Sequence, residues 1–425
     1  MKKIRDLSCS EAEFEYEKIR GEYEKYCKSG LSLDLSRGKP NSDQLNASAG
    51  ILDLSLSRED CINPLGIDYR NYGFVDGIPE AKELFADLLG LDKNNIVVAG
   101  NSSLQLMYDA LSRAMLFGTP DSTCPWCREE GLKWICVVPG YDRHFKITED
   151  LGFELISVKM TENGPDMDEV ERLCLDPKVK GIWCVPKYSN PTGNTYSDET
   201  VRRLASMKCA APDFRIMWDN AYAVHAFGEN DDKLLDIFEE AKKYGNENRV
   251  LYFASTSKIT LPGAGVAIVA ASEANIADIK RRMGTQTIGY DKINQLRHVL
   301  YFKNAENVML HMKKLGGALN TKFEILSEAL MPLKEAGVAE WTKPNGGYFI
   351  SLDVTFGSAK RVYELMKNAG VTLTSAGATF PYGIDPEDKN LRLAPSYPAD
   401  EDLALASKIL VLAVLLSALE TKIGK

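Results

Sequence analysis

The chain has 425 residues, too many for one ordinary hydrophobic core, so we expect two or three substructures. Hydrophobic residues make up 44% and charged residues 26%, a composition typical of soluble globular proteins. The net charge of −9 arises from scattered acidic side chains without a basic stripe, which disfavours nucleic-acid binding and a membrane-surface role.

The ends of the chain and its cysteines indicate a cytoplasmic protein. Residues 1–6 lead into an acidic helical pattern and not into the apolar core of a signal peptide. The most apolar part of the tail, residues 409–419, is about half as long as a membrane span, so we expect a core-facing terminal helix. Nine cysteines without an ordered framework fit a reducing compartment.

Helical and strand patterns follow one another along most of the chain. Residues 1–30 have the pattern of a helix, and residues 31–35 that of a short strand. From about residue 75, short apolar runs alternate with helical stretches such as 104–115 and 199–207. We expect strands at residues 96–99, 135–138, 155–158, 182–185, 216–218, 251–254 and 266–270.

Short apolar strands separated by helices indicate an α/β fold with a mostly parallel, seven-stranded sheet flanked by helices. Beyond residue 300 the chain is again helical, and strand patterns then follow at 347–352 and 391–393. These segments predict a smaller α+β domain that the N-terminal residues complete. We expect a small-domain segment at 1–65, a large domain at 66–300 and the rest of the small domain at 301–425.

Cys124 and Cys127 form a Cys-x-x-Cys motif. This spacing is compatible with a redox dithiol or with half of a metal site. The pair lies in a polar loop and not between a strand and a helix, and none of the four histidines has ligand spacing to it. We therefore expect two free loop thiols and no metal site.

Polar residues follow four of the apolar runs. Ligands of parallel sheets bind at the carboxyl ends of strands, so these residues are the candidates for a functional site. They are Ser102 and Ser103 after 96–99, Asn190 after 182–185, Asp219 and Tyr222 after 216–218, and Ser255, Ser257 and Lys258 after 251–254.

Two of these residue types suit pyridoxal phosphate (PLP). PLP withdraws electrons while its ring nitrogen is protonated, which requires a buried carboxylate beside that nitrogen. Asp219 fits this role, although an aspartate there can also cap a helix. The PLP aldehyde requires a neutral amine, and desolvation lowers the pKa of a lysine such as Lys258. The alternative, a solvated surface lysine, is disfavoured by the preceding strand.

The other candidates suit the phosphate and the ring oxygen of the same cofactor. Ser102 and Ser103 would open a helix whose free N–H groups attract an anion, or would simply cap it. Hydroxyl groups of Ser255 and Ser257 can donate to the phosphate. The side chains that can contact the ring oxygen O3′ are those of Asn190 and Tyr222, although Asn190 also fits an ordinary turn.

Over roughly residues 30 to 420 the chain resembles the fold-type I aminotransferases of the aspartate aminotransferase superfamily. The matching motifs are Asn190-Pro191-Thr192-Gly193, Asp219-x-x-Tyr222, Ser255-x-Ser257-Lys258 with Pro262-Gly263 after it, and Arg392 near the C-terminus. Their order and spacing agree as well as their residue types. The resemblance implies a fold-type I, PLP-dependent transferase.

The resemblance also implies individual roles. Lys258 carries PLP as a Schiff base and moves a proton between Cα of the substrate and C4′ of the cofactor. Asp219 pairs with the ring nitrogen, and Tyr141, in Pro139-Gly140-Tyr141, stacks on the ring. Asn190 and Tyr222 contact O3′. Tyr72 corresponds to a tyrosine that binds the phosphate of the partner subunit, which implies a homodimer with shared active sites.

The same comparison assigns the substrate contacts. Arg392 corresponds to the arginine that clamps the substrate α-carboxylate, for which a planar guanidinium is well shaped. Gly38 matches a segment that closes over the substrate, and Asn190 is also expected to bind the substrate. A dicarboxylic substrate needs a further cation, and the segments that can face the cleft offer Arg37, Lys39, Arg143 and Lys292. Of these, Arg37 and Arg143 are the first candidates.

One position departs from the family pattern. Gly265 stands where the family usually has an arginine that neutralises the cofactor phosphate. With glycine at this position, and with the segments 256–265 and 291–298, the chain is similar to the divergent bacterial aspartate aminotransferases of subgroup Ic. The resemblance therefore implies transamination between aspartate and 2-oxoglutarate by a ping-pong mechanism.

Three other functions stay open. The amino donor can be alanine or an aromatic amino acid, or the protein can be a PLP-dependent lyase or β-decarboxylase of the same fold. The third is a non-catalytic, ligand-sensing domain of a transcription regulator. Such regulators carry an N-terminal helix-turn-helix domain, for which the acidic segment before residue 31 is too short.

Overall fold

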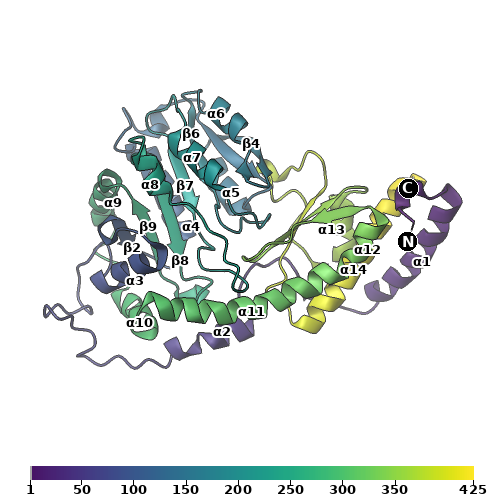
Figure 1. Ribbon diagram of the computed structural model, residues 1–425, viewed down its shortest axis with the longest axis horizontal. Helices are drawn as coiled ribbons and strands as arrows, with labels where there is room; N and C mark the ends of the chain where they lie inside the picture. Colours follow the sequence, from purple (N-terminus) through teal and green to yellow (C-terminus); the bar gives the residue numbers. More distant parts are fainter. Residues whose placement is uncertain (1) are drawn as a thin grey trace.

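A computed structural model describes residues 2–425. Figure 1 shows a large α/β unit beside a smaller unit, with the long helix α11 (Ala305–Ala329) running along the base of both. Both ends of the described chain lie at the far side of the small unit (Figure 1). The arrangement leaves the carboxyl ends of the main strands facing the small unit.

The large unit is built on a sheet with the strand order β2-β9-β8-β7-β6-β3-β4-β5. All seven strands expected from the apolar runs are present, and β5 adds an eighth. The strands are β2 (Ile96–Val98), β3 (Lys133–Val138), β4 (Glu154–Thr161), β5 (Gly164–Pro165), β6 (Val179–Cys184), β7 (Arg215–Asp219), β8 (Val250–Ser255) and β9 (Ala267–Ala271).

The sheet is mostly parallel, and its exceptions are β9 and β5. β3, β4, β6, β7 and β8 pair in parallel, whereas β9 runs antiparallel to β2 and to β8. β5 pairs antiparallel with the end of β4, and its first residue, Gly164, has a φ of 124°. A two-residue strand has no apolar run, so the sequence pattern does not reveal it.

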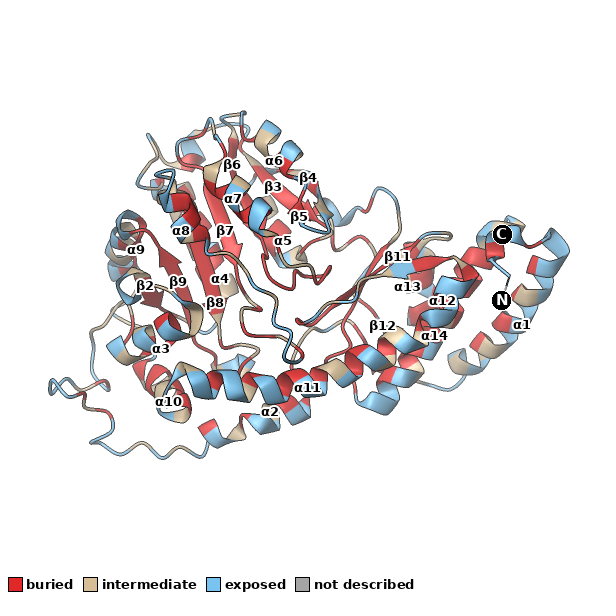
Figure 2. Cartoon of the chain, in the orientation of Figure 1, coloured by how far each residue is buried: buried red, intermediate tan, exposed pale blue. Residues whose placement is uncertain are grey.

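Helices cover both faces of this sheet, and the strands other than β4 are almost entirely buried between them (Figure 2). Alternate residues of β3 belong to different cores: Ile135 and Val137 face α3, α6, α7, α8 and α10, while Trp134 and Cys136 face α4, α5 and α9. The helices are α3 (Pro79–Leu89), α4 (Ser103–Phe117), α5 (Asp142–Asp150), α6 (Met167–Leu173), α7 (Asp198–Ser206), α8 (Ile237–Lys242), α9 (Glu273–Gln286) and α10 (Lys292–Phe302).

The small unit joins the two ends of the chain. Its core combines side chains from residues 4–35 with side chains from residues 319–419, while the boundaries at 65/66 and 300/301 stay a prediction. β1 pairs with β12, and β10, β11 and β13 form an antiparallel sheet. The elements are α1 (Cys9–Cys27), β1 (Leu33–Asp34), α2 (Ser42–Ala47), α12 (Met331–Ala336), β10 (Ala339–Trp341), β11 (Ile350–Val354), α13 (Ala359–Asn368), β12 (Val371–Thr372), β13 (Asn390–Leu393) and α14 (Asp400–Ile423).

Helix α14 is long and apolar enough to cross a membrane by length and composition alone. Its most apolar window is 72% buried inside the protein, where α14 packs against α1, α11, α12 and α13. The expected core-facing terminal helix is therefore confirmed. The helix begins earlier than the predicted apolar run at residues 409–419. Its acidic first turn, Asp400 to Asp402, has no apolar pattern that would have revealed it.

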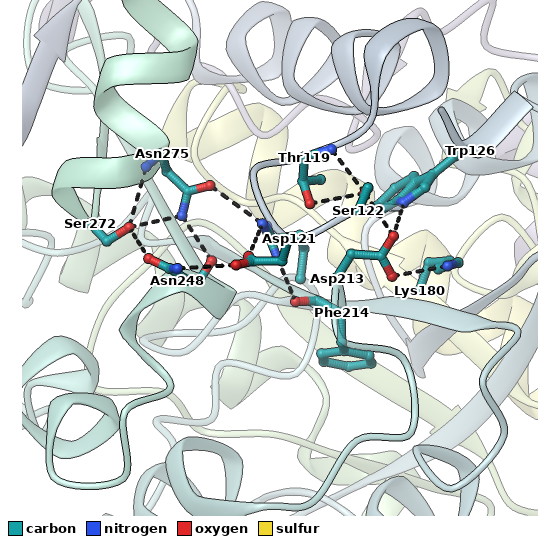
Figure 3. Close-up of polar contacts among 11 residues, drawn as sticks. Thr119, Asp121, Ser122, Trp126, Lys180, Asp213, Phe214, Asn248, Ser272 and Asn275 are labelled. Atoms are coloured by element: carbon teal, nitrogen blue, oxygen red, sulfur yellow. Dashed lines mark hydrogen bonds and ion pairs between the residues drawn. The ribbon is translucent and has the colours of Figure 1, made fainter. Parts of the chain in front are cut away.

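A buried polar network surrounds the start of β7 (Figure 3). The Asp213 carboxylate, just before β7, accepts hydrogen bonds from Trp126 Nε1 (2.7 Å), Ser122 Oγ (2.7 Å) and Lys180 Nζ (2.9 Å). Beside it, Arg215 donates to Asp121 (2.7 Å). Burial alone would raise the pKa of Asp213, but these donors hold it below its usual value.

The network also explains the Cys-x-x-Cys segment. Trp126, between the two cysteines, is fully buried and anchors the loop through its bond to Asp213. Cys124 and Cys127 have free thiols, as expected. Across residues 2–425, no three His, Cys, Asp or Glu side chains are grouped as metal ligands.

The Asp213→Ala variant should lower the free energy of unfolding by about 3 kcal/mol, because the buried donors Trp126 and Lys180 and the half-buried Ser122 lose their acceptor. Urea unfolding followed by fluorescence would measure this. A matched control is Glu169→Ala, which removes only the exposed pair with Arg172 and should cost about 1 kcal/mol or less. Equal unfolding midpoints for the two variants would contradict the anchoring role of Asp213.

Candidate active site

A cavity of about 440 Å³ lies at the carboxyl ends of the main strands, and residues of the small unit form its other wall. Five connections that follow β2, β3, β6, β7 and β8 supply side chains to it, because strands that run in the same direction end at the same edge. The predicted residues that line it are Arg37, Gly38, Ser102, Ser103, Tyr141, Arg143, Asn190, Asp219, Tyr222, Ser255, Ser257, Lys258 and Arg392.

Tyr72 is the predicted residue that does not line this cavity. It lies on the long connection between α2 and α3, which extends away from the large unit (Figure 1), and is 79% exposed. The same connection carries exposed Leu52, Leu65 and Ile67. Within one chain, Tyr72 is thus separate from the other candidates.

Asp219 is the last residue of β7 and is 3% exposed. Its Oδ2 lies 3.0 Å from Nε2 of His144, whose ring stacks on Trp183 with centroids 4.4 Å apart. Its Oδ1 is buried and has no hydrogen-bond partner among the described residues. A buried carboxylate oxygen without a partner is costly, so this atom is suited to accept an N–H from a bound ring.

His144 is a site residue that the sequence reasoning missed. The sequence excludes the histidines as metal ligands and predicts no other role for His144, whereas α5 places it three residues after Tyr141 with its ring against Asp219. The pattern Tyr141-x-x-His144 at the start of a helix was the available signal, because residues three apart share a helix face.

Lys258 follows β8, which is paired in parallel with β7. Its Nζ lies 4.8 Å from the ring centroid of Tyr222 and 6.0 Å from that of Tyr348. Burial lowers the pKa of Lys258 from its ordinary value of 10.5, although the Asp219 carboxylate opposes this shift. Desolvation raises the pKa of Tyr222 well above its usual value, so that this phenol stays protonated.

Hydroxyl groups and helix amides meet at one end of the cavity. Ser102 is the N-cap of α4, with its Oγ accepting from the backbone N–H of Gln105, and Ser103 is the first residue of that helix. Ser255 Oγ donates to Ser257 Oγ over 3.0 Å, and Ser257 Oγ donates to the carbonyl of Asn101. This group of donors is suited to an anion.

The structure gives a physical reason for glycine at position 265. A Cβ at Gly265 would lie 2.7 Å from the Asn101 carbonyl oxygen and 3.4 Å from Ser257 Oγ, so no side chain fits there. Arg297 lines an adjoining cavity of about 410 Å³ together with Asn101 and Gly265, and its Nε is buried without a partner among the described residues. The sequence reasoning did not identify Arg297.

Arg392, on β13, enters the cavity from the small unit and is 9% exposed. Its Nη1 donates to Asp142 Oδ1 (2.8 Å) and to Asn190 Oδ1 (3.5 Å). Its Nη2 donates to Thr374 Oγ1 (3.2 Å), and its Nε has no partner among residues 2–425. Asp142 and Thr374 were not predicted, because the strand pattern gives no sign that they meet Arg392.

The segment around Gly38 forms the small-unit wall. A Cβ at Gly38 would lie 2.1 Å from the ring of Phe349, which is buried, so glycine is required for this close approach. Arg37 is 64% exposed and pairs with Asp34. Lys39 Nζ lies 4.0 Å from the centroid of the Tyr397 ring. Arg143 is exposed and has no ion-pair partner in the described chain.

Known proteins share this arrangement over the whole chain. The aspartate amino-transferase family profile matches residues 7–425. The aspartate aminotransferase of Corynebacterium glutamicum is 47% identical over 418 residues, which cover 98% of this chain and 96% of that protein.

Solved structures agree with this result. An aspartate transaminase structure from Corynebacterium glutamicum superposes with a TM-score of 0.96 at 47% identity, covering 99% of both chains. The α-aminoadipate aminotransferase LysN of Thermus thermophilus, solved with N-(5′-phosphopyridoxyl)-L-leucine, shares the fold at 19% identity, with a TM-score of 0.73 and coverage of 92% and 94%. The chain therefore belongs to the aspartate amino-transferase family and is an aminotransferase of fold type I.

Proposed function

We propose that this aminotransferase works with PLP attached to Lys258 and transfers the amino group of aspartate to 2-oxoglutarate. The observation that carries the proposal is a pair of groups on neighbouring strand ends. Asp219 presents a buried carboxylate oxygen without a partner, and Lys258 brings an amine of lowered pKa to the same cavity. These are the two groups that the cofactor requires.

The cavity residues fit the parts of PLP. When bound, PLP supplies an electrophilic carbon and a ring that stabilises negative charge at the substrate Cα. Asp219 would hold the proton on the ring nitrogen, with His144 fixing the carboxylate. Tyr141 would cover the ring. The hydrogen-bonding groups for O3′ would come from Asn190 and Tyr222, and those for the phosphate from Ser102, Ser103, Ser255 and Ser257.

Lys258 would also move a proton during the reaction. With PLP bound in this cavity, the Lys258 Nζ would be placed to accept the proton from the substrate Cα and to return it to the neighbouring carbon. A neutral amine is needed for this, and the burial that lowers the pKa of Lys258 favours the neutral form. The reaction runs in two halves, with aspartate as the donor in the first and 2-oxoglutarate as the acceptor in the second.

The substrate would be oriented by its carboxylates. Arg392 would bind the α-carboxylate, with Asn190 and Gly38 beside it. For the distal carboxylate we propose Arg143 first, because it lines the cavity and has no ion-pair partner among residues 2–425. Arg37 is the second candidate, since Asp34 already neutralises its charge.

The enzyme is further proposed to be a cytoplasmic homodimer. The connection between α2 and α3 exposes Leu65 (83%), Leu52 (64%) and Tyr72 (79%). Large apolar side chains grouped on a protruding segment are typical of an interface. Tyr72 would then reach the cofactor phosphate of the partner subunit and complete that site.

Lys258→Ala should abolish turnover and the visible absorbance that PLP gains when it is bound to a lysine, while circular dichroism stays unchanged. Lys39→Ala is the matched control, since it removes another lysine of the same cavity and should keep the absorbance. An active, yellow Lys258→Ala protein would refute the cofactor attachment.

The donor is identified by adding aspartate, glutamate, alanine and phenylalanine in turn and following the loss of that absorbance. We expect aspartate to react fastest. Arg143→Ala should lower kcat/KM for aspartate about tenfold or more and leave that for alanine nearly unchanged, because a charge-assisted hydrogen bond is lost only with the dicarboxylate. Arg37→Ala should have a smaller effect. Release of ammonia without oxo-acid exchange would instead indicate a lyase.

Tyr72→Phe should weaken PLP binding about tenfold, because one hydrogen bond to a charged group is lost. A mixture of Tyr72→Phe and Lys258→Ala subunits tests the shared site. If Tyr72 acts across the interface, each hybrid dimer has one intact site, and mixing restores cofactor affinity and activity. If mixing restores neither, or if sedimentation shows an active monomer, the interface role of Tyr72 is excluded.

A further inference from the structure

We propose that Asp142 is a placeholder carboxylate for Arg392. It neutralises the guanidinium while no substrate is bound and gives way to the substrate carboxylate, so that it sets how tightly the enzyme holds its substrates. The inference rests on the proposed role of Arg392 and adds a specificity-determining residue to it.

The two side chains meet across the cavity from different units. Asp142 is the first residue of α5 in the large unit, and Arg392 lies on β13 in the small unit. Asp142 Oδ1 is 2.8 Å from Arg392 Nη1, and both residues line the cavity. Their ion pair therefore occupies space where a ligand between the two units would bind.

The charge on Arg392 explains why a placeholder is useful. Arg392 is 9% exposed, and a cation that is buried without an anion is strongly destabilising. Among the described residues, Asp142 is the carboxylate that pairs with it; the other acceptors, Asn190 Oδ1 and Thr374 Oγ1, are neutral. Asp142 thus supplies the negative charge that Arg392 needs when no substrate carboxylate is bound.

The geometry also explains why a substrate can displace Asp142. A guanidinium has five N–H groups and binds a free carboxylate best through two parallel hydrogen bonds. Asp142 engages it through one oxygen, and Arg392 Nε is still without a partner. A bidentate carboxylate would therefore gain a hydrogen bond that Asp142 does not provide.

Arg392 does not need Asp142 to keep its position. Thr374 Oγ1 accepts from Nη2 at 3.2 Å, and the guanidinium carbon lies 4.9 Å from the centroid of the Phe349 ring. The Asp142 side chain is 34% exposed, so it can turn toward water, which would solvate the carboxylate after it leaves Arg392. A second carboxylate at the same guanidinium would repel it, which favours this release.

The test uses the PLP-loaded enzyme and succinate, a dicarboxylate without an amino group, as the probe. Asp142→Asn keeps the size of the side chain and removes its charge. We expect the Kd of succinate from calorimetry, and the KM for aspartate, to fall about threefold to tenfold, because the ligand no longer displaces a charged partner. Asp142→Glu should restore the weaker, wild-type-like binding.

Glu149→Gln is the matched control, because it removes a carboxylate from the same helix that pairs with Lys146 and does not line the cavity. It should leave both constants unchanged. An unchanged or higher Kd in Asp142→Asn would overturn the proposal, since a higher Kd means that Asp142 positions Arg392. An equal fall in Glu149→Gln would overturn it too, since the effect would then be one of net charge.

Arg392→Gln separates this inference from the proposed function. It should weaken succinate binding strongly, and adding Asp142→Asn to it should give no tightening. If Arg392→Gln binds succinate like the wild type, Arg392 is not the carboxylate site and the proposed function fails at that residue. If it binds weakly while Asp142→Asn alone shows no gain, only the placeholder proposal fails.

Discussion

Burying a carboxylate with one oxygen unpaired is costly, and Asp219 is buried in this way at the end of β7. The surrounding structure supports only its other oxygen, through His144 and the Trp183 ring on which His144 stacks. The remaining oxygen is thus prepared for a partner that this chain does not supply. The position of Lys258 follows from the same constraint, because β8 is paired in parallel with β7 and ends at the same edge.

The cavity is completed by a unit that is assembled from both ends of the chain. β1 pairs with β12, and β13 carries Arg392 toward Asn190 and Asp142 of the large unit. Gly38 allows the N-terminal segment to pass directly over the Phe349 ring. Substrate recognition is therefore proposed to depend on contacts between the units, whereas the proposed cofactor contacts come mostly from the large sheet.

The proposed phosphate site differs from the family pattern for a steric reason. The Asn101 carbonyl and Ser257 leave no room for a side chain at Gly265, so an arginine cannot extend from that position without moving them. The α4 amides and three hydroxyl groups, those of Ser102, Ser255 and Ser257, gather instead. Arg297 lines the adjoining cavity together with Asn101 and Gly265 and brings a positive charge to it.

The sequence by itself determined the seven main strands, because each contains a short apolar run and all but β4 are buried on both faces, and it determined which residues follow them. Thirteen candidates consequently came together in one cavity, although their chemical roles stay proposals. The tertiary structure decided the rest. His144, Asp142, Thr374 and Phe349 acquire their places through contacts between elements far apart in the chain, and β5 arises from two residues with no apolar run. Such contacts depend on how strands and helices pack in space, and a local pattern of residues contains no information about that packing.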